Sequence, residues 1–159
     1  MRQRASGRKS EARRVSDVMV ANAVTVDVSA TLLDAARRMR DENVGMLPVM
    51  EDDALRGVIT DRDLVVRAMT RDVRPSELGV REYLSEPPRC AEPDWSIEDA
   101  ADAMSDQQIG RLPVVDPAGH VVGVVTLSSL ALRSPQKSGT LKTAQEVSRR
   151  SARAAAGDL

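Results

Sequence analysis

The chain has 159 residues, of which 42% are hydrophobic and 30% are charged, a composition that predicts one globular unit. Aromatic residues amount to only 1% of the chain, which argues against a nucleic-acid binder that stacks bases on aromatic side chains. One cysteine and one histidine exclude an internal disulfide and a structural zinc site built by one chain. No apolar run has the length of a membrane span, so we expect a soluble, cytoplasmic, metal-free protein.

The net charge of −1 is spread unevenly along the chain. Residues 1–14 hold six basic side chains and one acidic side chain without hydrophobic periodicity, and we interpret them as a disordered basic tail. Residues 134–159 form a second polar, basic tail with five basic and two acidic side chains. Nucleic-acid binding through these tails is the less favoured reading, because solvated charged tails are common.

The first half of the acidic body is predicted to contain a short helical turn, a strand, an amphipathic helix, a hairpin and a second helix. Their expected ranges, in order, are residues 15–20, 24–28, 32–43, 47–50 with 56–60, and 61–70. Thr31 and Asp34 have the spacing of a capping box at the start of the amphipathic helix. Pro48 in the first hairpin strand predicts a sheet edge or a strand start.

The second half repeats this order, so the chain is predicted to be an internal repeat. Its expected elements cover residues 80–84, 89–91, 97 onward, 112–115 with 121–126, and 127–133. The matching segments are Gly57-Val58-Ile59-Thr60 with Gly123-Val124-Val125-Thr126, Leu47-Pro48-Val49 with Leu112-Pro113-Val114, and Thr31 with Ser96. We therefore divide the body into repeat 1 (15–70), a linker (71–79) and repeat 2 (80–133). Each repeat is too small to bury a sufficient core alone, so the two are expected to fold against each other.

The segment from Gly57 to Leu64 is the most informative one for function. A strand that runs into a helix there places Thr60 and Asp63 at a helix N-terminus, where backbone N–H groups attract anions. A hydroxyl and a carboxylate three residues apart could hold a sugar hydroxyl and a phosphate together. Taken alone, the segment is more typical of a helix that Asp61 or Thr60 simply caps.

With Gly-hydrophobic-x-Thr-x-x-Asp at its end (Gly57 to Asp63), the repeat resembles the CBS domain. Two in tandem, over about residues 15–133, resemble the Bateman module of small stand-alone bacterial two-CBS proteins. The resemblance implies an α+β fold in which two αβ repeats pack their three-stranded sheets about a pseudo-twofold axis. It also implies a homodimer, no covalent cofactor, and clefts that take an adenosyl ligand of the AMP, ADP, ATP, NAD or S-adenosylmethionine class.

The resemblance also assigns ligand-binding roles to residues of this sequence. Thr60 and Asp63 match the family's ribose-binding pair, and Thr126 keeps the threonine in repeat 2. Ser129 stands where the second carboxylate would be, so we expect the Asp63 cleft to be the better site. The remaining expected contacts, which supply backbone groups, apolar walls or a guanidinium for phosphate, are Thr25, Val26, Leu47, Pro48, Val58, Arg62 and Arg111.

Other arginine, cysteine and aspartate residues are also candidates for functional roles. Arg56 and Arg133 are additional candidates for a phosphate contact. Cys90, on a predicted strand, is expected to be a packed thiol rather than a redox sensor. Asp61 and Asp63 could suggest acid–base catalysis or a magnesium site, but repeat 2 has no such pair, so no catalytic residue is assigned.

Two functions follow from these observations. The leading hypothesis is a non-catalytic regulatory module that binds an adenosyl ligand between its CBS repeats and signals to an unidentified protein partner. The alternative is a ligand-free dimeric interaction or stress-response module, which the loss of the acidic residue at Ser129 leaves open.

Overall fold

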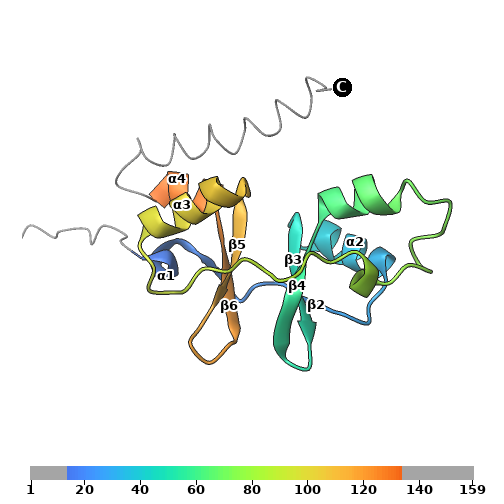
Figure 1. The fold of residues 1–159 in the computed structure, drawn as a ribbon, viewed down its shortest axis with the longest axis horizontal. Helices are drawn as coiled ribbons and strands as arrows, with labels where there is room; N and C mark the ends of the chain where they lie inside the picture. The colour runs from blue at the N-terminus through green and yellow to red at the C-terminus, as the bar shows by residue number, and fades with distance from the viewer. Residues whose placement is uncertain (1–13, 134–159) are drawn as a thin grey trace, which may run out of the picture.

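The structure is a computed structural model, and it describes residues 14–133 (Figure 1). The tails predicted at both ends lie outside the described residues, apart from Arg14. The first half contains α1 (Val15–Val18), β1 (Val20–Ala21), β2 (Val26–Asp27), α2 (Leu32–Asp41), β3 (Met46–Glu51), β4 (Ala54–Thr60) and the π-helix η1 (Asp63–Ala68). The second half contains the 3₁₀ turn η2 (Val80–Glu82), α3 (Ile97–Gln107), β5 (Arg111–Val115), β6 (Val121–Thr126) and α4 (Leu127–Arg133).

The strands form two three-stranded sheets, one in the order β2-β3-β4 and the other in the order β1-β6-β5. The sheets stand side by side in the middle of the molecule, and the helices cover their outer flanks (Figure 1). The α+β fold class with two three-stranded sheets is therefore confirmed.

The two amphipathic helices begin where the sequence predicts. The Thr31 hydroxyl accepts the Asp34 N–H at 3.1 Å, and the Ser96 hydroxyl accepts the Asp99 N–H at 3.0 Å. In each case the aspartate also accepts the backbone N–H of the capping residue, which completes the capping box. The apolar stripe of each helix then lies in a core, with Leu32, Ala35 and Met39 buried in α2 and Ile97, Ala100, Ala101 and Met104 buried in α3.

Each half has its own hydrophobic core, but each core is completed by a segment from the other half. Val15 and Val18, at the start of the chain's first half, are fully buried in the core of the second half. Val80 and Tyr83, which begin the second half, are buried in the core of the first half. The two halves thus exchange their opening segments, which binds them into one unit.

The exchanged segments also pair with strands through their backbones. Val20 pairs with Val124 of β6, and Ser85 pairs with Val58 of β4 through N–H···O bonds of 2.8 and 3.1 Å. We call residues 19–21 and 83–85 the crossover segments. They pass close to the repeated glycines, Gly57 and Gly123. A Cβ at Gly57 would lie 2.6 Å from the Ser85 carbonyl oxygen, and one at Gly123 would lie 2.6 Å from the Val20 carbonyl oxygen.

Two expectations for the strands are corrected. Pro48 lies in β3, which is the central strand of its sheet and not an edge. The strand tolerates proline there because the opposite residue, Val58, directs its own N–H and C=O toward Ser85, so the Pro48–Val58 pair needs no bond from Pro48. The strand expected at residues 89–91 is reduced to one parallel bridge between Ala91 and Val114.

We predict that Gly57→Ala and Gly123→Ala each lower the free energy of unfolding by about 1–3 kcal/mol, because the added methyl group meets a paired backbone carbonyl. Gly110→Ala is the matched control, since a Cβ there meets nothing within 4 Å. It should be neutral or stabilise the chain by up to about 1 kcal/mol. Urea unfolding measures all three, and equal losses would contradict the crossover contacts as the reason for these glycines.

Candidate ligand-binding site

The site is built around the turn that joins β4 to η1. The Thr60 hydroxyl donates to Asp63 Oδ2 at 2.7 Å, and the Thr60 N–H donates to the same oxygen at 2.9 Å. The Asp63 N–H in turn donates to the Thr60 hydroxyl at 3.2 Å. Thr60 and Asp63 therefore form a capping box, in which Thr60 has the simple capping role that is one reading of the sequence. The capping role fixes the carboxylate in place with only 15% of its side chain exposed.

The second oxygen of Asp63 faces Arg67, one turn along η1. Arg67 Nη1 lies 3.3 Å from Asp63 Oδ1 and donates to the Tyr83 carbonyl at 2.7 Å. Each carboxylate oxygen has two acceptor positions. The capping bonds occupy both positions of Oδ2, while Oδ1 retains one in addition to its long contact with Arg67. Asp63 can therefore still accept a hydroxyl from outside the protein.

Repeat 2 builds the same turn from uncharged groups. The Ser129 hydroxyl accepts the Thr126 N–H at 3.0 Å and donates to the Thr126 carbonyl at 2.9 Å. The Thr126 hydroxyl accepts the Ser129 N–H at 3.0 Å. The Ser129 hydroxyl uses its one donor and one of its two acceptor positions within the turn, and the turn has no carboxylate to accept a pair of sugar hydroxyls.

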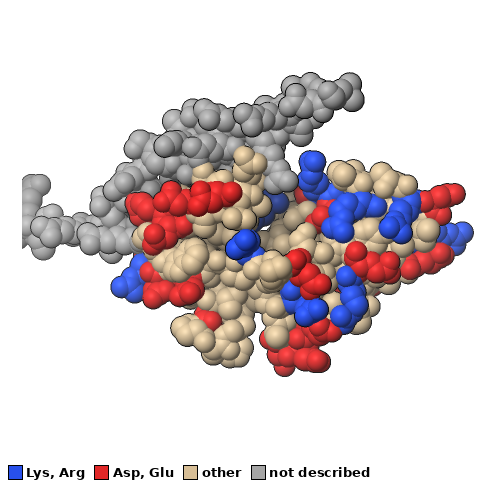
Figure 2. Space-filling model, in the orientation of Figure 1, with Lys and Arg blue, Asp and Glu red and all other residues tan. Residues whose placement is uncertain are grey.

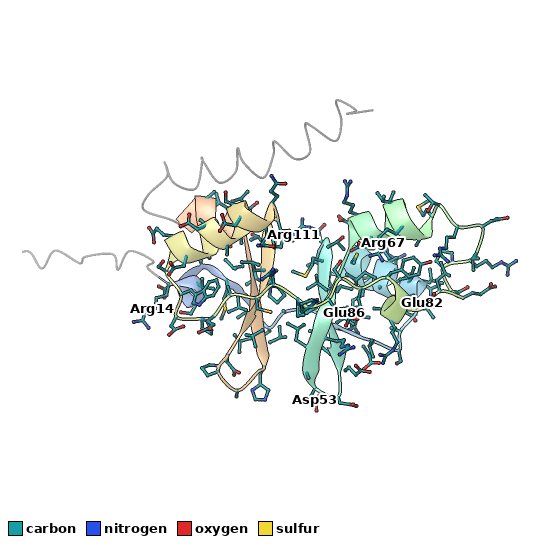
Figure 3. All side chains as sticks on the ribbon, viewed as in Figure 1. Arg14, Asp53, Arg67, Glu82, Glu86 and Arg111 are labelled. Carbon is teal, nitrogen blue, oxygen red and sulfur yellow. The ribbon has the colours of Figure 1, made fainter. Side chains whose placement is uncertain are left out.

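Arg111, from the first position of β5, reaches across to repeat 1 (Figure 3). Its Nη1 donates to the Gly45 carbonyl at 3.4 Å. A Cβ at Gly45 would lie 3.0 Å from that nitrogen and 2.7 Å from Asp61 Oδ2. The absence of a side chain at Gly45 therefore leaves room for a guanidinium from one repeat and a carboxylate from the other.

The other arginines differ in their availability. Arg62 is exposed at the start of the helical turn. Arg56 pairs with Glu86 at 3.0 Å and with Glu51 at 3.5 Å, so carboxylates already neutralise it. The Arg133 side chain lies outside the described part of the chain. The charges near the site are thus balanced, with Arg62 and Arg111 against Asp61 and Asp63, and the face shown in Figure 2 carries both signs rather than one basic groove.

Most of the residues predicted to form the apolar walls of the site are buried in the protein. Val26 and Leu47 belong to the buried core cluster of the first half, and Leu47 is fully buried. Pro48 is buried in β3, whereas Val58 is half-buried in β4. That these four residues also contact a ligand stays a prediction.

Thr25 lies in a different place from Thr60. It borders a hollow of about 570 Å³ whose wall comes from β2, the turn of the first hairpin and the second hairpin. The lining residues are Thr25, Asp27, Arg38, Met50, Asp53, His120 and Val121. Arg38 donates to the Thr25 carbonyl at 2.5 Å, so this backbone group already has a partner. The hairpin turn is at the opposite end of β3 from Met46, the partner of Thr60, and Thr60 is not among the residues that line this hollow.

Sequence reasoning missed the contacts that surround Asp63. Arg67 follows Asp63 by four residues, which is the spacing of an ion pair on a helix, and that signal was available. The Tyr83 carbonyl comes from an exchanged segment and could not be found from local spacing. Asp61 lies near Gly45 because the two residues continue the β3–β4 hairpin, with the Asp61 N–H donating to the Gly45 carbonyl at 3.2 Å. Among the described residues, no group of three or more potential ligands stands close enough to hold a metal, and no helix has the length and hydrophobicity of a membrane span.

Comparisons with known proteins agree on one family. The family model described as the CBS domain matches residues 15–70 and again residues 80–134. CBS domain-containing protein YhcV of Bacillus subtilis is 39% identical over 118 residues, which cover 74% of this chain and 83% of that protein. Hypoxic response protein 1 of Mycobacterium tuberculosis is 31% identical over 121 residues, which cover 76% of this chain and 84% of that protein.

Two similar solved structures contain ligands. CBSX2 in complex with AMP has a TM-score of 0.65 and 26% identity, and the match covers 76% of this chain and 95% of that one. The CBS domain pair of protein MJ0100, in complex with 5′-methylthioadenosine and S-adenosyl-L-methionine, has a TM-score of 0.68 and 25% identity. That match covers 75% of this chain and 93% of the other.

We predict that Cys90, the counterpart of Thr25 in repeat 2, reacts slowly with iodoacetamide at pH 7. Burial raises the pKa of the Cys90 thiol above its ordinary value, and the thiolate is the nucleophile. Alkylation should be slower in the folded chain than in the chain unfolded by urea, and it should accelerate as the pH rises. Equal rates for the folded and unfolded chains would contradict a packed thiol.

Proposed function

This chain belongs to the CBS domain family, and from that premise we propose that it is a non-catalytic regulatory module for an adenosyl ligand. The observation that carries the proposal is the Asp63 carboxylate, which the Thr60 capping bonds hold in place and which keeps an open acceptor position on Oδ1. A carboxylate so placed can accept a ribose hydroxyl. The complexes of CBSX2 with AMP and of MJ0100 with adenosyl compounds support this ligand class.

The charges near Asp63 favour a ligand with little net charge. Arg111 and Arg62 could each contact a phosphate, but Asp61 lies beside Arg111 and would repel a chain of several phosphates. AMP or a nucleoside such as 5′-methylthioadenosine therefore suits the site better than ATP. The uncharged turn at Ser129 supports one strong site per chain rather than two.

Regulation by this module would require that ligand binding changes its shape and that a partner detects the change. The module would act in the cytoplasm by changing how its repeats, or two copies of the chain, pack together when the ligand binds. An unidentified protein partner would respond to that change.

We predict that AMP or 5′-methylthioadenosine raises the melting temperature of the wild-type chain and has no effect on Asp63→Asn. A ligand at about 100 times its dissociation constant should add roughly 2.7 kcal/mol of stability. Thermal unfolding with AMP, ADP, ATP, NADH, S-adenosylmethionine and 5′-methylthioadenosine provides the measurement. Asparagine keeps an oxygen for the cap while it removes the charge.

Asp99→Asn is the matched control, because Asp99 has the same capping role at the start of the outer helix α3. This variant should lose a similar amount of intrinsic stability and keep the full response to ligand. A response that Asp63→Asn retains, or the absence of any response in a well-folded wild type, would refute the proposed site.

A second candidate function is the ligand-free dimeric interaction module, which one surface feature favours. Val65 and Val66 on η1 and Met69 at its C-terminal cap are 58%, 50% and 73% exposed. Apolar side chains gathered at the surface are typical of a protein interface.

If a second copy of the chain covers this surface, Met69→Glu should convert a dimer into a monomer. Val20→Glu, at a position 61% exposed on β1, is the control and should leave the dimer intact. Sedimentation velocity distinguishes the species. A dimer that survives Met69→Glu would exclude η1 as its interface.

A further inference from the structure

Arg67 connects the candidate ligand site with the crossover segment at residues 83–85. One nitrogen, Nη1, serves both the Asp63 carboxylate at 3.3 Å and the Tyr83 carbonyl at 2.7 Å. The same guanidinium lies over the Tyr83 ring, 5.7 Å from its centre. Arg71 also lies over this ring, at 5.9 Å, but no contact joins it to Asp63.

The two hydrogen bonds of Arg67 differ in length, and the longer one, to Asp63, is the one that a ligand can weaken. The contact of 3.3 Å with Asp63 is near the long limit for N–H···O, whereas the bond of 2.7 Å to the Tyr83 carbonyl is short, and the guanidinium charge assists both. A hydroxyl that donates to Asp63 Oδ1 would use the same oxygen and draw charge from it. The long contact between Arg67 and Asp63 would then weaken, and the bond to the Tyr83 carbonyl would hold Arg67 more firmly.

We infer that Arg67 is a positioning residue that reports occupation of Asp63 to the crossover segment at residues 83–85. The inference rests on the proposed function, because it assumes that a ligand hydroxyl reaches Asp63. When that happens, the guanidinium shifts from Asp63 toward the Tyr83 carbonyl and ring. The shift acts on a segment whose next residues, Leu84 and Ser85, contact β4 at Gly57 and Val58.

Tyr83 is well placed to respond to this shift. Its side chain is only 3% exposed, and its hydroxyl has no hydrogen-bond partner among the described residues. The ring is therefore held by packing and by two guanidinium groups rather than by a bond at its polar end. Because the segment from Tyr83 leads directly into repeat 2, a movement there changes the connection between the two halves.

Repeat 2 lacks the carboxylate and the aromatic ring of this arrangement. Ser129 replaces the carboxylate, and Val18 occupies the position that corresponds to Tyr83. The carboxylate and the aromatic ring that Arg67 joins are thus present in repeat 1 and absent at the corresponding positions of repeat 2.

Tyr83 is the one tyrosine of the chain, so 3-fluorotyrosine incorporation gives a single ¹⁹F NMR signal at this position. The first arm needs no ligand: Asp63→Asn should shift the Tyr83 signal in the wild-type background. The same substitution should lose most of that shift in an Arg67→Gln background and keep it in an Arg71→Gln background. Arg71→Gln is the matched control, since it removes the other cation over the ring.

The second arm adds AMP, or 5′-methylthioadenosine if AMP does not raise the melting temperature. The ligand should shift the Tyr83 signal in the wild type and in Arg71→Gln, and most of the shift should vanish in Arg67→Gln. If the ligand raises the melting temperature while the Tyr83 signal stays fixed, the inference is overturned and the proposed function stands. If neither ligand binds, the proposed function fails, and the first arm alone decides whether Arg67 connects Asp63 to Tyr83.

Discussion

The close approach of each crossover segment to a glycine is the contact on which the rest of the structure depends. The Ser85 carbonyl lies where a side chain at Gly57 would be, and the Val20 carbonyl lies where a side chain at Gly123 would be. This approach allows Ser85 and Val20 to pair with β4 and β6, and it carries Tyr83 and Val18 into the opposite cores. Neither half would have a complete core without the other. A change in one crossover segment therefore alters the packing of both halves.

The two repeats share one backbone arrangement, but their strand-to-helix turns differ in chemistry. Both repeats use a threonine at the end of a strand and a polar residue three positions later to cap the next helix. In repeat 1 the capping group is a charged carboxylate that retains an acceptor for a ligand, and in repeat 2 it is an uncharged serine whose one donor is used within the turn. The turns share the threonine but differ at the next three positions, and the difference between Asp63 and Ser129 separates a candidate binding site from a structural cap.

Much of this was accessible from the sequence because it is local. The capping boxes at Thr31 and Ser96, the two hairpins and the pair Thr60–Asp63 follow from spacing and propensity alone. The central position of Pro48 did not, because it depends on where Val58 directs its backbone bonds. The partners of Asp63 beyond Thr60 and the reach of Arg111 to Gly45 arise from packing between distant segments, which periodicity does not encode.

Amide hydrogen exchange of the full chain, with and without saturating AMP or 5′-methylthioadenosine, tests the central claim most directly. The account predicts slower exchange at residues 60–68 and at residues 83–85, where Ser85 donates to Val58, with little change at residues 126–130. Equal protection of the two strand-to-helix turns, or protection confined to residues 126–130, would contradict a site in repeat 1 that is coupled to the crossover segment.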